Sequence, residues 1–242
     1  MAIRRGNNFR QRKKTTATWK TLLKKWSIRI VGGFFAVTIF WVLVLKFINP
    51  PITYLMIKRS FEWKAADKGF KIEKKWLAYG ELSNNLKRAA IAGEDAHFLS
   101  HNGFDTKAIK EAIEKNKAGK NLRGGSTISQ QVAKNVFLWP ERSWLRKGLE
   151  AYFTVLIEFF WSKKRILEVY LNVIETGQGV YGAEAAAHYY FHKSAKSLTK
   201  KEAALIIAVL PNPRKWDARR PSNYVNSRAN NIVRYMGHYS IP

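Results

Sequence analysis

Cysteine is absent from this chain of 242 residues. Its absence excludes disulfide scaffolds, Cys-ligated zinc, iron–sulfur clusters and thiol catalysis, although it does not fix the redox compartment. Acidic residues are scarce, because 17 Asp and Glu stand against 43 Lys and Arg and leave a formal charge of +26. The apolar content of 46% is too high for a disordered chain. A charge of this size suits nucleic acid, an anionic membrane surface or a polyanionic substrate.

The basic residues are concentrated at the amino terminus. Residues 1–29 hold ten Lys and Arg and no acid, and an apolar run over 30–48 follows, interrupted only by Lys46. A helix over that run would be about 28 Å long, close to the thickness of the hydrocarbon core of a bilayer. A basic flank marks the cytoplasmic side. We therefore predict a cytoplasmic tail over 1–29, one transmembrane anchor over 30–48 and an exported domain over 52–242.

Two alternatives compete with an anchor, a cleaved signal peptide and a buried helix of a soluble protein. No small-x-small cleavage site follows the apolar run, and the bulky segment Asn49-Pro50-Pro51 stands there instead. Ten cations on one flank are unusual for a buried helix. An exported domain meets little DNA or RNA, so the orientation also disfavours a nucleic-acid binder.

The exported part reads as a mainly α domain without convincing alternating strands or internal repeats. Thr127 and Gln130 have the spacing of a capping box that opens a helix running through Phe137. Segment 52–63 is either an interfacial helix or a first core helix, because periodicity does not decide between them. Other helices are expected from Ser83 and over 105–123, 145–161, 166–174 and 199–210.

Glu94 and Asp95 fall where the helix from Ser83 should end. The negative end of the helix dipole and the neighbouring carboxylate would both raise the Glu94 pKa toward values useful for proton transfer. An ordinary solvated acidic pair is the plainer alternative. His97 and His101 are four residues apart, but no third metal ligand is evident, and a structural hydrogen-bonded His101 is favoured over zinc.

A second motif joins Gly124-Gly125 to Ser126 and Thr127 just before the capped helix. Exposed backbone amides at a helix amino terminus are a natural anion site. The run is not a P-loop, because no Lys-Ser/Thr pair closes it. Lys134 lies on the same helical face as Thr127 and would contribute to the same site.

A third cluster contains Arg142, Arg146 and Glu150, which recur every four residues and share a face if a helix begins near Arg142. A solvent-exposed ladder of ion pairs is the alternative. The apolar residues that follow Glu150 favour partial burial of its carboxylate instead.

Two carboxylates on separate helices, clustered cations and an anion-binding turn together favour glycosyl chemistry with a diphosphate leaving group. One carboxylate would act as a base on an attacking hydroxyl, as in inverting enzymes. The cations would neutralise charge that develops on the leaving group. A lysozyme-type hydrolase needs the carboxylates but has no use for Lys134, Arg142 and Arg146.

At these residues the sequence resembles the peptidoglycan glycosyltransferases, a family shared by bifunctional penicillin-binding proteins and monofunctional enzymes. The resemblance spans about residues 75–215 and rests on five ordered motifs, after which too little chain remains for a transpeptidase domain. The motifs are Glu94-Asp95-x-x-Phe98-x-x-His101-x-Gly103, Gly124-Gly125-Ser126-Thr127-Ile128-Ser129-Gln130-Gln131 with Lys134-Asn135, Arg146-Lys147-x-x-Glu150, Lys163-x-x-Ile166-Leu167-Glu168-x-Tyr170-Leu171-Asn172, and Glu202-Ala203-Ala204 with Leu210-Pro211-Asn212-Pro213.

The resemblance implies a lysozyme-like α lobe and a smaller lobe that enters the outer leaflet of the inner membrane. It assigns Glu94 as the base that deprotonates the 4-hydroxyl of N-acetylglucosamine on incoming lipid II. It places Glu150 as a second catalytic residue that organises the leaving-group site or its divalent cation. The implied substrate-binding residues are Lys134, Arg142, Arg146, Thr127, Gln130, Gln131, Asn135, Asp95, Phe98, His101 and Ser126.

The resemblance further implies an inner-membrane protein with a periplasmic catalytic domain. Its partners would be lipid II, the growing glycan chain, membrane lipids and other wall-synthesis or division proteins. It also implies dependence on Mg²⁺ or Mn²⁺, although no ligand set can be read from the residues, and no organic cofactor is expected. Two alternatives remain, a muramidase-like lytic enzyme and a non-catalytic wall or division scaffold.

Overall fold

The computed structural model describes residues 19–66, 69–107, 110 and 125–242. Its chain divides into two units, residues 1–41 and 42–242. Residues 1–18 of the predicted tail and most of the helix expected over 105–123 lie outside the described residues.

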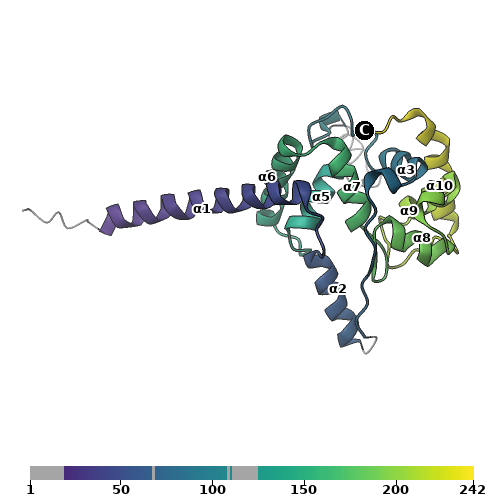
Figure 1. The fold of residues 1–242 in the computed structure, drawn as a ribbon, viewed down its shortest axis with the longest axis horizontal. Coiled ribbons are helices and arrows are strands. Elements are labelled where there is room, and N and C mark those ends of the chain that lie inside the picture. The colour runs from purple at the N-terminus through teal and green to yellow at the C-terminus, as the bar shows by residue number, and fades with distance from the viewer. Residues whose placement is uncertain (1–18, 67–68, 108–109, 111–124) are drawn as a thin grey trace, which may run out of the picture. The chain divides into compact units, whose positions relative to one another are not determined.

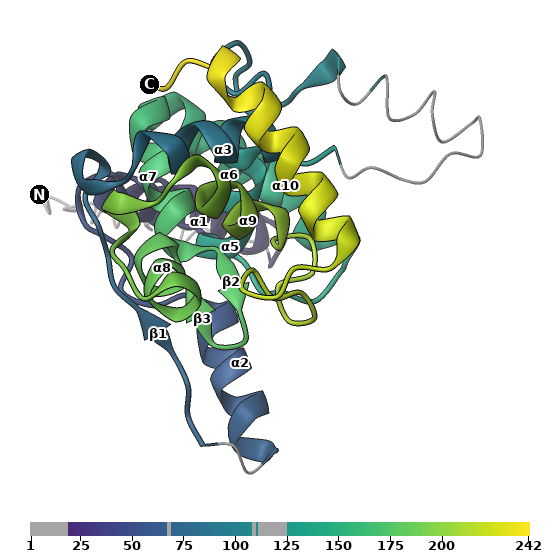
Figure 2. The same cartoon turned by 90° about the vertical axis from the view of Figure 1, so that its right-hand side faces the viewer.

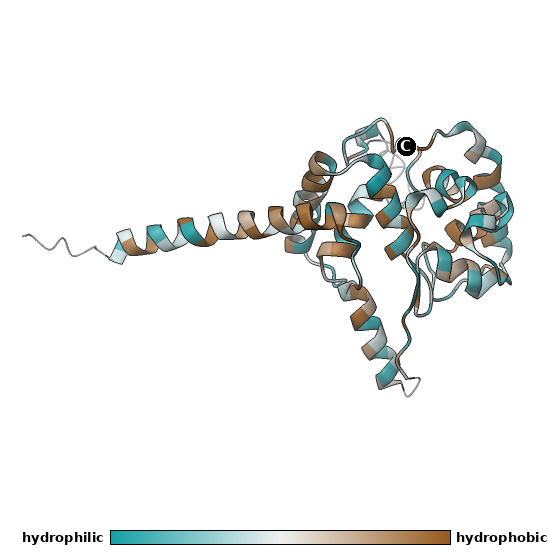
Figure 3. Ribbon diagram, viewed as in Figure 1, coloured by the Kyte–Doolittle hydropathy of each residue, from teal (hydrophilic) through white to brown (hydrophobic). Residues whose placement is uncertain are grey.

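Helix α1, Trp19–Phe47, supplies the described part of the first unit. Within the described residues it is the one helix long and apolar enough to cross a membrane. The helix begins at Trp19 and not at Ile30, because the Lys and Leu residues of the expected tail are good helix formers. In Figure 3 the brown colour of hydrophobic residues covers more of α1 toward its carboxyl end.

The second unit is built mainly from helices, which confirms the predicted fold class (Figure 1). Their bounds are α2 Tyr54–Ala65, α3 Asn84–Glu94, α5 Ile128–Phe137, α6 Trp144–Phe160, α7 Lys163–Val173, α8 Ala183–Phe191, α9 Lys200–Ala208 and α10 Asn223–Tyr235, with short 3₁₀ turns at Tyr79–Glu81, Ala195–Ser197 and Met236–His238. Most of these helices begin at a hydroxyl cap whose side chain accepts a first-turn amide hydrogen bond, which satisfies amides that otherwise lack a partner. The caps are Thr53, Ser83, Thr127, Ser143, Ser162, Thr199 and Ser222.

A small sheet, absent from the sequence prediction, lies beside these helices. Its order is β1-β3-β2, with β1 Glu73–Lys74 parallel to β3 Val180–Tyr181 and β2 Glu175–Gly177 antiparallel to β3. Strands of two or three residues are too short for an alternating pattern, so the sequence does not indicate them.

Helices α5 and α7 form the centre of the core, where Val132, Leu167 and Leu171 are fully buried. On the other side α3 packs against α9, and α10 covers both (Figure 2). Helix α2 projects away from this body in Figures 1 and 2, and among its residues only Met56 and Ser60 are buried. Segment 52–63 therefore forms a largely exposed helix and not a core helix.

Candidate active site

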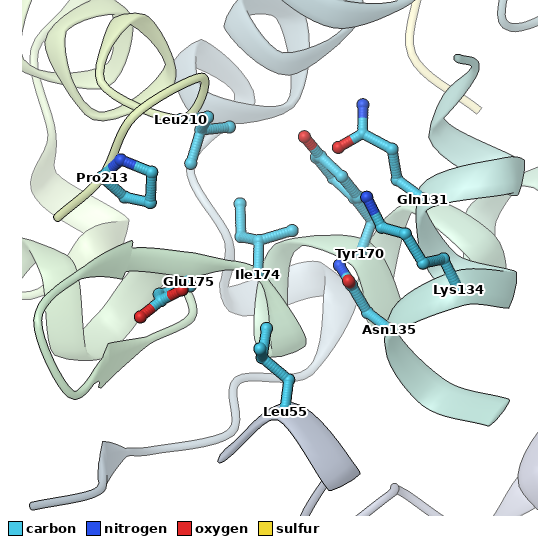
Figure 4. A pocket seen from close by; sticks show the side chains of 9 residues that line it. All are labelled: Leu55, Gln131, Lys134, Asn135, Tyr170, Ile174, Glu175, Leu210 and Pro213. Atoms are coloured by element: carbon cyan, nitrogen blue, oxygen red, sulfur yellow. The ribbon is translucent and has the colours of Figure 1, made fainter. Parts of the chain in front are cut away.

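A cavity of about 180 Å³ opens between α2, α5, α7, β2 and the turn after α9. Figure 4 shows polar side chains of α5 on one side and Glu175 on the other, with apolar residues between them. The lining residues are Leu55, Gln131, Lys134, Asn135, Tyr170, Ile174, Glu175, Leu210 and Pro213. Three of the predicted site residues, Gln131, Lys134 and Asn135, therefore share one cavity.

Glu94 is the last residue of α3, as the sequence predicts, and its side chain is only 13% exposed. Each carboxylate oxygen accepts a hydrogen bond. Arg228 donates to Oε1 at 2.8 Å, and Gln131, which lines the cavity, donates through Nε2 to Oε2 at 3.0 Å. Two donors from different helices thus hold the carboxylate, which does not itself line the cavity but contacts the cavity-lining Gln131.

Burial is the main reason that the Glu94 pKa is raised. Hydrogen bonds from Gln131 and Arg228 and the positive charges of Arg228 and Lys134 oppose the shift without cancelling it. The predicted direction is confirmed, but the predicted contribution of Asp95 is not among the causes. Desolvation therefore replaces the like-charge neighbour as the physical origin.

Asp95 turns away from Glu94 and is 5% exposed. Its Oδ1 accepts a hydrogen bond from His101 Nε2 at 2.9 Å, and its Oδ2 accepts one from the backbone amide of Ile128, also at 2.9 Å. Gly103 donates its amide to His101 Nδ1. The expected hydrogen-bonded, structural His101 is confirmed.

The amino terminus of α5 is occupied by the protein's own groups. Asp95 accepts the amide of Ile128, while Thr127 accepts the amide of Gln130 and donates its hydroxyl to the carbonyl of Gly103. Gln130 completes the capping box by accepting the amide of Thr127 at 3.0 Å. The capping box is confirmed, and the amides of Thr127, Ile128 and Gln130 are engaged by the protein's own groups. Ser126 is exposed in front of the helix, and Gly124 lies outside the described residues.

Phe98 is not among the residues that line the cavity, and its side chain is fully buried. The ammonium of Lys163 lies 4.7 Å from the centre of the Phe98 ring and donates to the carbonyl of His101 at 2.6 Å. Phe98 and His101 thus fix the loop that follows Glu94.

Glu150 is buried on α6 between two cations, as its apolar surroundings predict. Arg146 donates to Oε2 at 3.3 Å, and Lys147 donates to Oε1. Arg146 is itself buried, so the pair is not a solvent-exposed ladder. Lys147 has no assigned role in the sequence prediction.

Arg142 does not share that helical face. Helix α6 begins at Trp144 after the cap Ser143, so Arg142 precedes the helix and is exposed. The expectation that Arg142 shares a helical face with Arg146 and Glu150 is wrong, because the cap at Ser143 makes the helix begin after Arg142.

The charge of Lys134 interacts with the carboxylates of both Glu94 and Glu150. Burial lowers the pKa of its ammonium, as do the charges of Arg146 and Lys147, while Glu150 and Glu94 raise it. Lys134 therefore lies within reach of the fields of both Glu94 and Glu150. The buried carboxylate of Glu94 and the cationic cluster around Glu150 therefore both act on Lys134, which lines the cavity.

Sequence reasoning missed three residues of this site. Arg228 contacts Glu94 from α10, 134 positions along the chain, and no local pattern connects them. Tyr170 lines the cavity with a fully buried side chain whose hydroxyl has no hydrogen-bond partner within the described chain. Glu175 faces the same cavity, and burial raises its pKa against the opposing charges of Arg59 and Arg214.

The oxygen atoms that could serve as metal ligands in this site do not fit a divalent cation held by the protein alone. Both oxygens of Glu150 accept from cationic side chains, and both oxygens of Glu94 are hydrogen-bonded. Across the described ranges, no three His, Asp or Glu side chains gather as a ligand cluster. The expected dependence on Mg²⁺ or Mn²⁺ stays a prediction, and no chemical step is derived through a metal.

A buried carboxylate and a cationic cluster that both act on a cavity-lining lysine are the groups that transfer away from an anionic leaving group requires. Comparisons with known proteins agree. The profile of the family described as Transglycosylase matches residues 64–237. The chain belongs to this family.

Curated relatives extend the match over most of the chain. A protein of Bdellovibrio bacteriovorus (strain HD100) is 50% identical over 215 residues, which cover 89% of this chain and 86% of that relative. A protein of Pseudomonas putida (strain W619) is 52% identical over 214 residues, covering 88% and 91%. A third, of Pseudomonas entomophila (strain L48), is 51% identical over 222 residues, covering 92% and 94%. Each is named a biosynthetic peptidoglycan transglycosylase.

Proposed function

We propose that this chain is a peptidoglycan polymerase that lengthens glycan strands from lipid II. The observation that carries the proposal is the buried carboxylate of Glu94, with its raised pKa, in the electrostatic reach of Lys134. The substrate class comes from the names of the relatives. A base that must hold a proton near neutral pH needs a pKa above that of an ordinary glutamate.

In the proposed step, Glu94 removes the proton from the 4-hydroxyl of N-acetylglucosamine on incoming lipid II. The oxygen attacks the anomeric carbon of the terminal N-acetylmuramic acid of the growing chain. The bond from that carbon to the lipid diphosphate breaks from the opposite face, so the configuration inverts to a β-1,4 link. Undecaprenyl diphosphate departs with the bonding electron pair.

The leaving diphosphate requires positive charge, which Lys134 and Arg146 supply in this proposal. Glu150 is paired with Arg146 and Lys147, so it would orient these cations and limit their mutual repulsion. Arg142 is exposed one residue before the cap of α6 and would reach the diphosphate from the solvent side. Gln131 and Asn135 would position the sugars in the cavity.

The proposed location is the inner membrane, with α1 as the anchor and the second unit in the periplasm. Ten cations and no acid within residues 1–29 support a cytoplasmic amino terminus. The exposed apolar side chains of α2, among them Ile57 and Phe61, support contact of this helix with lipid, where the substrate's polyprenyl tail is embedded.

The test is incubation of the purified full-length protein in detergent with radiolabelled lipid II. The comparison includes Glu94→Gln and a control, Glu73→Gln, whose carboxylate is about half exposed on β1. Wild type and the control should build glycan and release undecaprenyl diphosphate. Glu94→Gln should slow polymerisation by roughly 10²- to 10⁴-fold, the usual contribution of a general base.

Undiminished polymerisation by Glu94→Gln would contradict the assignment of the base. Wild-type protein that cleaves finished glycan without making any would favour the muramidase-like alternative. A folded wild type that does neither would favour the scaffold. Circular dichroism of each variant establishes that it is folded.

A further inference from the structure

The carboxylate of Glu94 has a cationic partner outside the five motifs described above. Arg228, near the middle of α10, donates one guanidinium nitrogen to Glu94 Oε1 at 2.8 Å and to the backbone carbonyl of Gly93 at 3.0 Å. The second bond satisfies a carbonyl in the last turn of α3, which has no partner within its own helix. Arg228 thus binds both the side chain of Glu94 and the end of the helix that carries it.

The packing around this contact leaves little freedom. A Cβ atom added to Gly93 would lie 2.7 Å from Ile207 Cγ2 on α9 and 3.1 Å from Ile232 Cδ1 on α10. Only glycine lets the three helices approach this closely. Ile232 lies one helical turn after Arg228, so the same face of α10 contacts both α9 and the end of α3. The close packing of α3, α9 and α10 therefore holds Arg228 next to Glu94.

The charged and titratable groups that face Glu94 come from three helices. Arg228 from α10 and Lys134 from α5 lower the Glu94 pKa, and Tyr170 from α7 is near enough for Glu94 to raise its own pKa. Helix α9 contributes the apolar Ile207 to this junction. Arg228 is the cation in direct contact with the carboxylate, whereas Gln131 on the other oxygen is neutral.

We propose that Arg228 is a positioning residue that keeps Glu94 ionised and holds its carboxylate against Gln131, which lines the cavity. The proposal rests on the proposed function, in which Glu94 is the base. Burial favours the protonated carboxyl, which cannot accept a proton from an attacking hydroxyl. A hydrogen bond from a guanidinium favours the ionised form more strongly than a neutral donor does. Arg228 therefore opposes the desolvation that the cavity imposes.

The experiment measures initial polymerisation rates of the full chain with subsaturating lipid II between pH 5 and 9. The variants are Arg228→Gln, which removes the charge, and Arg228→Lys, which retains it. The matched control is Arg234→Gln, an exposed arginine of the same helix. In Arg228→Gln the acidic limb of the pH profile should move upward by about 1–3 in pH, the usual effect of losing an opposite charge.

At pH 6 the Arg228→Gln variant should be slower than wild type by at least roughly tenfold, and this gap should narrow as the pH rises, because hydroxide restores the ionised base. Arg228→Lys should return the limb toward its wild-type position, and Arg234→Gln should match wild type throughout. A merely structural role for Arg228 would lower the rate by one constant factor at every pH. That result would overturn the proposal.

A second measurement does not depend on polymerisation. Carbon-13 NMR of the side-chain carboxyls of labelled glutamate follows the protonation of Glu94, whose signal is the one that disappears in Glu94→Gln. Its midpoint should lie at higher pH in Arg228→Gln than in wild type, and Arg228→Lys should lie between them. Equal midpoints would overturn the proposal even if wild type builds glycan. If wild type builds none, the proposed function fails, and this titration still decides the role of Arg228.

Discussion

At the scale of single residues, two opposing effects act on Glu94, the proposed general base. Its burial makes ionisation costly, while Arg228 and Gln131 each give one oxygen a donor that favours the ionised form. The net pKa stays raised, so at a pH between the unfolded and folded pKa values the native protein binds a proton that the unfolded chain releases. A raised pKa at Glu94 therefore favours the proposed catalysis but reduces the stability of the folded protein as the pH rises.

The stability of Glu94→Gln should accordingly depend on pH in a defined direction. Because the folded pKa of Glu94 lies above its unfolded value, wild type loses stability as the pH rises from that value, about 4.3, through the folded pKa. Glutamine does not titrate. The midpoint of thermal unfolding of Glu94→Gln should therefore rise relative to wild type between pH 5 and pH 8. A difference that stays constant over this range would contradict the raised pKa.

The position of Glu94 follows from sequence because a cap at Ser83 and a regular apolar pattern set both ends of α3. Its partner Arg228 does not, because the contact bridges α3 and α10 and depends on how both pack against α9. The predicted direction of the Glu94 pKa shift is confirmed, but the helix dipole and Asp95, from which it was predicted, are not among its causes. The cause is burial, which is a property of the assembled fold.

At the scale of elements, local hydrogen-bonding signals were the most informative part of the sequence. The capping box at Thr127 acts over three residues, so its spacing alone located the start of α5. The serine cap of α6 is equally local, yet the regular spacing of Arg142, Arg146 and Glu150 suggested an earlier start. Charge periodicity was the weaker signal, because a surface loop can place a cation at any spacing.

Thr127→Ala tests the role of this cap. The substitution removes the acceptor for the amide of Gln130 and the hydrogen bond to Gly103, which is buried. Unfolding free energy should fall by about 1–2 kcal/mol, as for other strong caps. Polymerisation should also slow, because α5 carries Gln131 and Lys134. Chemical denaturation and the lipid II assay measure the two effects.

Helix α9 supplies a matched control, because Thr199 and Glu202 form the same type of capping box at an exposed position. Thr199→Ala should reduce stability by a smaller amount, about 0.5–1 kcal/mol, and leave the polymerisation rate unchanged. Equal loss of activity in both variants would mean that α5 has no special part in placing the site.

At the scale of the whole molecule, the +26 charge is divided between a topological signal and a working domain. The first 29 residues account for ten of these charges, and the domain holds the cations around Glu150. A single total charge therefore misleads about partners, because its two parts face different environments in the proposed topology. The distribution of the charges along the chain, and not their total, disfavoured nucleic acid, and the motifs then favoured a diphosphate leaving group.

The natural absence of cysteine makes this topology directly testable. Asn8→Cys and Ser240→Cys each introduce a sole thiol, one in the basic tail and one at an exposed position of the second unit. In spheroplasts, a membrane-impermeant maleimide should label Cys at position 240 and leave position 8 unlabelled until the membrane is permeabilised. The reverse pattern would place the catalytic domain in the cytoplasm and exclude lipid II polymerisation in the periplasm.

The occupied amino terminus of α5 has a consequence for how this protein could evolve or be redesigned. Backbone amides are the same for every amino acid except proline, so an anion held by them is insensitive to most substitutions. Here Asp95 and Thr127 engage two of those amides, and in the proposed function side chains such as Lys134 and Arg146 recognise the anion. In that proposal the preference for a leaving group depends on side chains that can be substituted. Selectivity for the donor substrate can then be altered in small steps without rebuilding the helix.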